Sequence, residues 1–266
     1  MNVIRNILSS RSGKDGNFFD AIQNIIGFKP KVIKHYKRAF IHRSLNKKGL
    51  GDSAHDLLSD DTYTSIKIEV LYVDGYQPTV AAMNNFKAFL EERVYKPDGI
   101  SISSRPVASS GLAPFEIQEI VDIEDKERSF YNVGDEISIY IYFADGSNED
   151  DTDQRYVLGS AYRNTSMVIY GETINKFANR VNAPSKSVIE TAVLNHEFGH
   201  LFGLVNVGTE LQSDHEDPDS DGHCTEEKCL MRASLEFGTG IINQIRGTPP
   251  ELGPNCIADL QANGGK

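Results

Sequence analysis

The alternation of apolar and polar positions predicts a set of short β-strands in the middle of the chain. Residues 65–73 and 135–144 are rich in β-branched and aromatic side chains at alternating positions, and both predict strands. Three further strands are predicted over shorter or less regular runs: 99–107, 155–163 and 165–170.

Helical spacing appears between and after these strands. A helix is predicted close after Pro78, with one apolar stripe formed by Val80, Met83, Phe86, Leu90 and Val94. Residues 114–129 predict an exposed helix. A longer helix is predicted to begin at Pro184 and Ser185 and to end near Leu204. The order β-α-β-α-β-β-β-α predicts an α/β or α+β domain built on one sheet.

The distribution of charge adds a division that the hydrophobic pattern does not show. Residues 1–50 contain 11 Lys/Arg and 2 Asp/Glu, whereas residues 51–266 contain 16 and 36, so the net charges are +9 and −20. Such a break predicts units of different origin. We expect a basic segment over 1–50, a linker over 51–63 that is rich in Gly, Ser and Asp, and one folded domain over 64–266. No apolar run suits a membrane span, and no secretory signal follows the basic N-terminus.

The basic segment has a resemblance of its own. Residues 18–26 and 31–45 predict two short helices, and the words HYKRAFIHRSLN resemble the opening helices of bacterial ribonuclease III. The resemblance covers about the first 48 residues. The carboxylate-rich signature that supplies that family's metal ligands does not follow, so we expect a non-catalytic fragment. RNA binding through the basic charge of residues 1–50 is the alternative, and we do not expect nucleic acid to be the main partner.

One pentapeptide on the long predicted helix carries candidate chemistry. His196-Glu197-Phe198-Gly199-His200 has the form HExxH. Two imidazoles four residues apart project from the same helix face and can bind one zinc ion side by side. Glu197 follows the first ligand and can reach a water on that zinc. Two histidines on an amphipathic helix without metal are the structural alternative.

The sequence after the pentapeptide resembles that of metzincin metalloproteases. Their pattern is HExxHxxGxxH, or Asp at the last place; here Gly203 matches the glycine, but Asn206, a poor zinc ligand, stands at the last place. Residues 223–231 read HCTEEKCLM, and this HCx4CxM resembles the archaemetzincin pattern. That resemblance implies His223 as the third zinc ligand and Met231 as the Met-turn residue beneath the metal.

A wider stretch, residues 53–266, resembles a group of bacterial membrane metalloproteases. The words that carry this resemblance are SAHDLLSDDTYTSIKIEVLYVDG, LNHEFGHLFGLVN, HCTEEKCLM and CIADLQANGG. It implies a metzincin-like zincin domain, with a mixed twisted sheet, an active-site helix and a C-terminal subdomain that contains the Met-turn. It also implies zinc-dependent peptidase activity and an exported or membrane-anchored protein.

The insertion DHEDPDSDGHC offers alternatives. His215 is a second candidate for the third zinc ligand, although the spacing from His to Met favours His223. Asp217, Asp219 and Asp221 precede a glycine, and such alternating carboxylates can bind Ca²⁺ through hard oxygen ligands. A solvated acidic loop is the interpretation that we favour for these three residues.

The three cysteines allow few arrangements. Cys224 and Cys229 could form a disulfide in an exported protein or remain thiols in a reducing compartment. Archaemetzincins carry a later CxxC that completes a second, structural zinc site. Only Cys256 follows here, which excludes a site made of four cysteines.

These patterns together predict a zinc-dependent endopeptidase that acts on protein or peptide substrates. The two histidines of the pentapeptide and His223 would hold Zn²⁺, and Glu197 would act as general base toward a zinc-activated water. The resemblance to metzincins also implies an edge strand that pairs with an extended substrate, and the strand expected at 155–163 is the candidate for it. A zinc-binding or protein-interaction domain with weak or absent catalysis is the alternative.

Overall fold

A computed structural model describes residues 43–236 and 247–266. The chain divides into two compact units, Met1–Ser44 and Leu45–Lys266, and the second unit carries all the elements described below. The helix expected over 18–26, and nearly all of the one expected over 31–45, fall outside the described residues. Within the described part of the chain, no helix has the length and apolar character needed to cross a bilayer.

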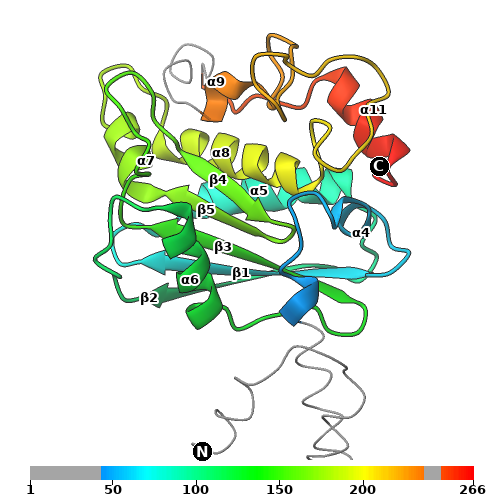
Figure 1. Cartoon of the computed structure of the whole chain (residues 1–266), viewed down its shortest axis with the longest axis horizontal. Helices are drawn as coiled ribbons and strands as arrows, with labels where there is room; N and C mark the ends of the chain where they lie inside the picture. The colour runs from blue at the N-terminus through cyan, green and yellow to red at the C-terminus, as the bar shows by residue number, and fades with distance from the viewer. Residues whose placement is uncertain (1–42, 237–246) are drawn as a thin grey trace, which may run out of the picture. The chain divides into compact units, whose positions relative to one another are not determined.

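The described strands form one five-stranded sheet with the order β2-β1-β3-β5-β4 (Figure 1). The first four of these run parallel, whereas β4 pairs antiparallel with β5. The sheet is therefore mixed, and β4 forms one of its edges. The strands are β1 Ser65–Val73, β2 Gly99–Val107, β3 Glu136–Ala144, β4 Gly159–Arg163 and β5 Ser166–Tyr170.

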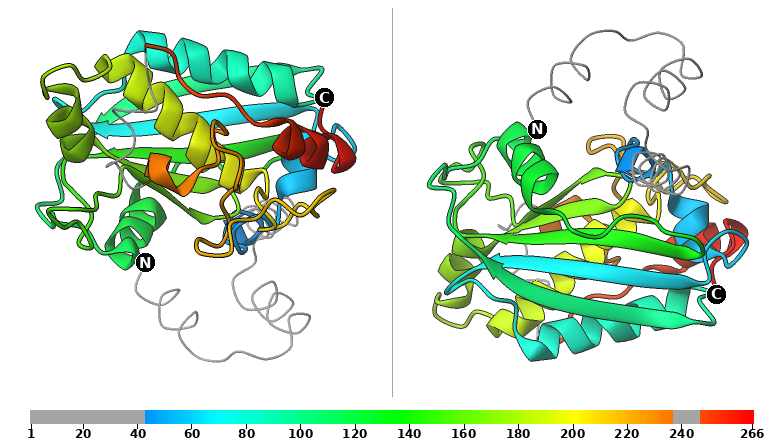
Figure 2. Two further views of the ribbon diagram at one scale, coloured as in Figure 1. Left: turned by 90° about the horizontal axis from the view of Figure 1, so that it is seen from above. Right: turned by 90° about the horizontal axis from the view of Figure 1, so that it is seen from below.

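Helices cover both faces of this sheet. The longest two, α5 and α8, lie together over one face, and α6 lies on the opposite side (Figure 2). The described helices are α4 Ala54–Leu58, α5 Val80–Arg93, α6 Ile117–Glu127, α7 Gly171–Ala178, α8 Lys186–Leu201, α9 Ala233–Glu236 and α11 Pro254–Ala262. This layering confirms the predicted α/β class.

The main core fills the space between the sheet and the α5–α8 layer. Side chains alternate along the strands, so Ile66 and Ile68 of β1 enter this core while Leu71 faces the smaller core on the other side. Phe198 of α8 packs edge-on against Phe86 of α5, with ring centroids 5.4 Å apart. Complete burial of a side chain of this size contributes about 1.5–3 kcal/mol, which holds α8 firmly on the sheet.

The predicted elements are present, with corrections at their ends. The bounds of β1 and β2 are as predicted, but β4 begins at Gly159 and not at residue 155. The apolar residues before Gly159 resemble a strand in sequence, but they do not pair as one. The Val157 N–H donates to Asp151 Oδ1 at 2.7 Å and not to a neighbouring strand. Val80, in the first turn of α5, is 76% exposed, although it belongs to the apolar stripe that was predicted to be buried. The sequence pattern did not predict α4, α7, α9 or α11.

The segment expected to be a linker, residues 51–63, is part of the folded unit. Leu57 and Leu58 of α4 are fully buried in the main core, together with Tyr63. Asn46, which precedes this segment, is also buried, and its side-chain amide donates to Asn132 Oδ1 at 2.7 Å. The folded unit therefore begins before residue 51, and the abundance of Gly, Ser and Asp misled the linker prediction.

Candidate metal centre

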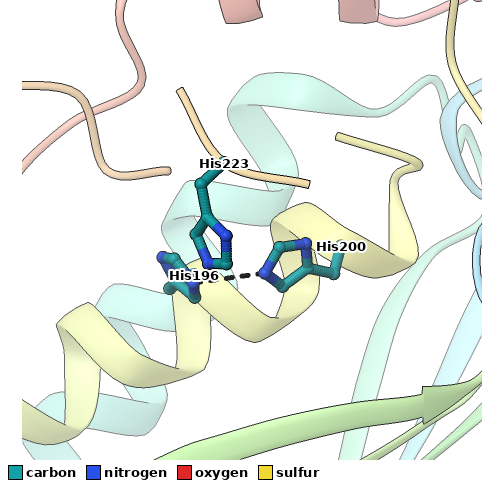
Figure 3. A group of neighbouring side chains, drawn as sticks. All are labelled: His196, His200 and His223. Carbon is teal, nitrogen blue, oxygen red and sulfur yellow. Dashed lines mark hydrogen bonds between the residues drawn. The ribbon is translucent and has the colours of Figure 1, made fainter. Parts of the chain in front are cut away.

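Helix α8 presents the HExxH pentapeptide at its C-terminal end. Residues 189–201 of this helix are buried without interruption because α5, the sheet and the C-terminal loops surround it. The four-residue spacing puts the imidazoles of His196 and His200 on the same face, and their Nε2 atoms lie 3.2 Å apart (Figure 3). Glu197 lies between them in sequence and is 1% exposed.

A third imidazole reaches this pair from the loop after the helix. His223 lies with its ring centroid 5.4 Å from that of His196 and 5.2 Å from that of His200 (Figure 3). One ligand atom from each ring falls within 4.8 Å of the others, and all three residues are buried. The structure thus brings together the three histidines that the sequence and the resemblance selected.

Backbone carbonyls fix the orientation of all three rings. Nδ1 of His196 contacts the Leu230 carbonyl at 2.8 Å, and Nδ1 of His200 contacts the Leu204 carbonyl at 2.9 Å. Nδ1 of His223 lies 3.0 Å from the Asp221 carbonyl. Each carbonyl assigns the proton to Nδ1, which makes Nε2 the basic nitrogen of each ring. This is the usual arrangement of metal-binding histidines.

The spacing of the nitrogens fits a zinc ion. Zinc binds imidazole nitrogen at about 2.0–2.1 Å, so two ligands of a tetrahedral site stand about 3.3 Å apart; the separation between His196 and His200 is 3.2 Å. Burial, together with the neighbouring His200 and His223 rings, lowers the pKa of His196 well below its usual value. The ring is therefore neutral near pH 7, as a metal ligand must be.

The carboxylate of Glu197 faces the edge strand. Its Oε2 accepts a hydrogen bond from the Ala161 N–H of β4 at 2.9 Å. Strand β4 comes this close because Gly159 has no side chain: a Cβ there would lie 2.8 Å from Glu197 Cγ and equally close to Val193 Cγ1. The glycine therefore lets the sheet edge lie directly against the part of α8 that carries the histidines.

Met231 packs against α8 at Gly199, in the turn that carries His196 and His200. A Cβ added to Gly199 would lie 2.3 Å from Met231 Sδ, so the thioether contacts the helix backbone between the two histidines. The Met231 carbonyl also accepts the Cys224 N–H at 2.7 Å, which closes the loop that carries His223. The Met-turn role that the resemblance implies for Met231 stays a prediction.

Comparisons with known proteins find partial similarities. No protein-family model matches the chain. A 48-residue N-terminal segment matches curated ribonuclease 3 proteins, at 60% identity for Zunongwangia profunda and 54% for Flavobacterium psychrophilum, over 18% of this chain. The matched segment spans only a fifth of the length of those ribonucleases.

Two of the structural neighbours are an archaemetzincin and a metalloproteinase. Archaemetzincin from Methanopyrus kandleri has a TM-score of 0.49 and 17% identity, over 75% of this chain and 96% of its own. Metalloproteinase-II from Bacteroides fragilis has a TM-score of 0.41 and 16% identity, over 76% of this chain and 54% of its own.

The alternative third ligand, His215, does not lie with the other histidines. Its Nε2 contacts Asp259 Oδ2 at 2.7 Å, and its Nδ1 faces Cys224 Sγ at 3.3 Å. These two contacts hold the ring in a separate buried cluster, so the structure does not bring His215, the alternative to His223, beside His196 and His200. Asn206 is also engaged elsewhere, because its amide donates to Glu216 Oε2 at 2.8 Å.

The disulfide considered for Cys224 and Cys229 is not formed. Both are buried free thiols, and so is Cys256. Cys229 Sγ lies 3.5 Å from Cys256 Sγ, and Cys224 faces His215 instead. The sequence argument missed the place of Cys256 in this cluster, since it joins from α11, far along the chain.

The calcium alternative receives no support from the geometry. Among the described residues, the groups of acidic, histidine and cysteine side chains whose ligand atoms converge within 4.8 Å do not include Asp217, Asp219 or Asp221. Asp217 Oδ1 instead accepts the Asp219 N–H at 3.1 Å and shapes a local turn. The acidic-loop interpretation therefore fits these residues better.

Proposed function

We propose that residues 45–266 form a zinc-dependent endopeptidase. The observation that carries this proposal is the convergence of His196, His200 and His223 beside Glu197. Three imidazoles in a buried cluster leave one position of a tetrahedral zinc ion for solvent or substrate, which is the donor set of a catalytic rather than a structural site.

Glu197 is the candidate general base. A bound zinc ion would supply an acidified water and would polarise the carbonyl of the scissile peptide. The Glu197 carboxylate lies next to the three histidines and is held by the Ala161 N–H at 2.9 Å. From this position it would accept the proton of the attacking water and later deliver it to the leaving amine.

Strand β4 is the candidate substrate-binding edge. It is the last strand of the sheet order and runs antiparallel to β5, so its outer side can pair with an extended peptide. Its Ala161 N–H already contacts Glu197, which places the strand beside the proposed base. A substrate paired along β4 would thus present its backbone carbonyls to the histidine cluster, which favours recognition of extended protein segments.

The substitution Glu197→Gln tests this assignment. The amide oxygen of Gln can still accept the Ala161 N–H, so the fold and zinc content should stay unchanged while the base is lost. We expect hydrolysis of casein or a quenched fluorescent peptide to fall at least about 100-fold. The wild-type activity should disappear with a chelator and return with zinc.

Two results would contradict the proposal. Full activity in the Glu197→Gln variant would show that another group accepts the proton. A wild-type protein that holds zinc at the three histidines but cleaves no peptide would point to the alternative class, a zinc-binding or interaction domain without hydrolysis.

A further inference from the structure

A second cluster of metal-binding side chains lies in the C-terminal part of the fold. It consists of His215, Cys224, Cys229 and Cys256, all of which are buried. The ligand atoms of His215, Cys224 and Cys256 lie within 4.8 Å of one another, and so do the Cys224 and Cys229 sulfurs. Cys229 Sγ and Cys256 Sγ are 3.5 Å apart. The three sulfurs therefore lie close to one another, and His215 lies close to two of them, those of Cys224 and Cys256.

The separations suit a shared metal ion better than a covalent bond. A disulfide requires about 2.05 Å between sulfurs, much less than the 3.5 Å between Cys229 and Cys256. Zinc binds thiolate at about 2.3 Å and imidazole at about 2.0–2.1 Å, so tetrahedral ligand pairs stand about 3.6–3.8 Å apart. The 3.3 Å between His215 Nδ1 and Cys224 Sγ is close to that range.

Backbone amides surround two of the sulfurs. Cys229 Sγ accepts the Met231 N–H at 3.4 Å and the Gly253 N–H at 3.2 Å. Cys224 Sγ accepts the Glu226 N–H at 3.4 Å. Amide donors that point at a sulfur are compatible with a metal-bound thiolate, which is the form of cysteine that binds a metal.

A buried carboxylate orients His215. Its Nε2 faces Asp259 Oδ2 at 2.7 Å, and Asp259 is 0% exposed. The carboxylate accepts a hydrogen bond from the Nε2–H, which leaves the lone pair of Nδ1 facing Cys224. Zinc-binding histidines commonly donate their other ring N–H to a carboxylate, which fixes the tautomer of the ring.

The local backbone holds His215 across from the cysteine loop. The Asp217 N–H donates to the His223 carbonyl at 2.8 Å, and the Thr225 N–H donates to the His215 carbonyl at 2.9 Å. The two segments therefore run antiparallel for a few residues. The arrangement is set by the main chain, so the position of His215 does not depend on a flexible side chain alone.

The archaemetzincin resemblance implies a structural zinc held by four cysteines, of which this chain has only three. We propose that His215 takes the place of the missing cysteine, so that His215, Cys224, Cys229 and Cys256 bind a second zinc ion. Three thiolates and one imidazole form a closed tetrahedral set, which is the donor set of a structural site. The ion would tie the inserted loop and α11 to the segment that carries His223. It would also help to position the first site, because two of its ligands are adjacent in sequence to residues of that site. Cys224 follows His223, and Cys229 precedes Leu230, whose carbonyl orients His196.

Glu226 is the rival for the fourth ligand. Its carboxylate comes within 4.8 Å of the Cys224 and Cys229 sulfurs. Its Oε1, however, accepts the Asn255 amide at 2.7 Å, whereas His215 also approaches Cys256 and has a carboxylate behind it. The geometry therefore favours His215, and Glu226→Gln is a matched control.

The first test isolates the second site in the full chain. The double variant His196→Ala/His200→Ala removes the first site, and elemental analysis should then find one zinc per chain. After replacement by cobalt, an intense thiolate-to-cobalt charge-transfer band should appear in the near ultraviolet. A double variant without metal, or a cobalt spectrum without the thiolate band, would overturn the proposal.

Further substitutions in that double variant assign the ligands. His215→Gln should weaken zinc affinity by at least about 100-fold, and Asp259→Asn by about 10–100-fold, because loss of the carboxylate frees the tautomer. Glu226→Gln should leave the affinity unchanged. The reverse result, with zinc lost in Glu226→Gln and kept in His215→Gln, would refute the assignment of His215.

A measurement on the unsubstituted chain does not depend on how the variants fold. Under native conditions the three thiols should react slowly with a thiol reagent, and a strong chelator should release zinc and expose them together. Thiol reactivity that the chelator leaves unchanged would count against a metal at these cysteines.

Discussion

The chain reverses direction at Gly203, and an added methyl group there should destabilise the fold strongly. Gly203 follows α8 with φ of +79°, a conformation that non-glycine residues rarely adopt. A Cβ at this position would lie 2.6 Å from the Thr209 backbone nitrogen and 2.9 Å from the Gly208 carbonyl carbon. Both atoms belong to the main chain, so neither can move aside as the end of a flexible side chain would.

The expected loss for Gly203→Ala has two parts. The left-handed backbone costs a residue with a Cβ about 1–2 kcal/mol, and overpacking against rigid neighbours adds about 1–3 kcal/mol. A total of about 3 kcal/mol is a large share of the 5–15 kcal/mol typical of a folded domain. For a unit of this size it corresponds to a fall in Tm of about 6–12 °C.

Gly111→Ala is the matched control for this experiment. Gly111 has a similar φ of +71°, but a Cβ there meets no atom within 4 Å. Urea and thermal unfolding of both variants should therefore give a loss of about 1–2 kcal/mol for Gly111→Ala and a clearly larger one for Gly203→Ala. Equal losses would refute the close approach. Because the Leu204 carbonyl orients His200, Gly203→Ala should also weaken zinc binding, whereas Gly111→Ala should not.

Three further predictions concern other buried contacts. Gly199→Ala should lower the free energy of unfolding by about 1–3 kcal/mol through its contact with Met231; in a double-mutant cycle with Met231→Ala, strictly additive losses would contradict that contact. Glu124→Gln should cost about 3–5 kcal/mol in urea unfolding, since it leaves the buried Arg128, 2.7 Å away, without its charged partner. Burial lowers the pKa of Lys96 to about 8, whereas an unfolded lysine titrates near 10.4. Between these pH values the unfolded state binds more protons, so the free energy of unfolding should rise with pH there, and Lys96→Met should flatten that rise.

The elements that could be predicted from the sequence are those whose burial follows a simple period. Strand β1 has alternating apolar residues and was predicted with its observed bounds. Helix α8 was predicted within a few residues at each end. Helix α7 was missed because GETINKFA has polar and β-branched residues of poor helix propensity. Its Ile174 and Phe177 are buried against the rest of the fold, and this tertiary contact outweighs the local preference.

The candidate site divides in the same way. The joint placement of His196, Glu197 and His200 follows from helical periodicity alone. His223 was selected by resemblance, because no local period connects a loop residue to a helix that ends more than twenty positions earlier. The role of Asp259 could not be predicted, since a lone acidic residue in a C-terminal helix carries no signal of a distant histidine. Its contact with His215 depends on the packing of α11 against the inserted loop.

The order of residues along the loop after α8 links the two clusters physically. His223 faces the first cluster while the adjacent Cys224 faces the second, as neighbouring residues of an extended segment do. Further along, Cys229 belongs to the second cluster, and the Leu230 carbonyl orients His196 in the first. A single loop thus contributes to both clusters, so a metal that orders this loop at one cluster is expected to favour binding at the other. Thermodynamic linkage then requires reciprocity: a metal at the cysteines should raise zinc affinity at the histidines by the same factor as a metal at the histidines raises affinity at the cysteines.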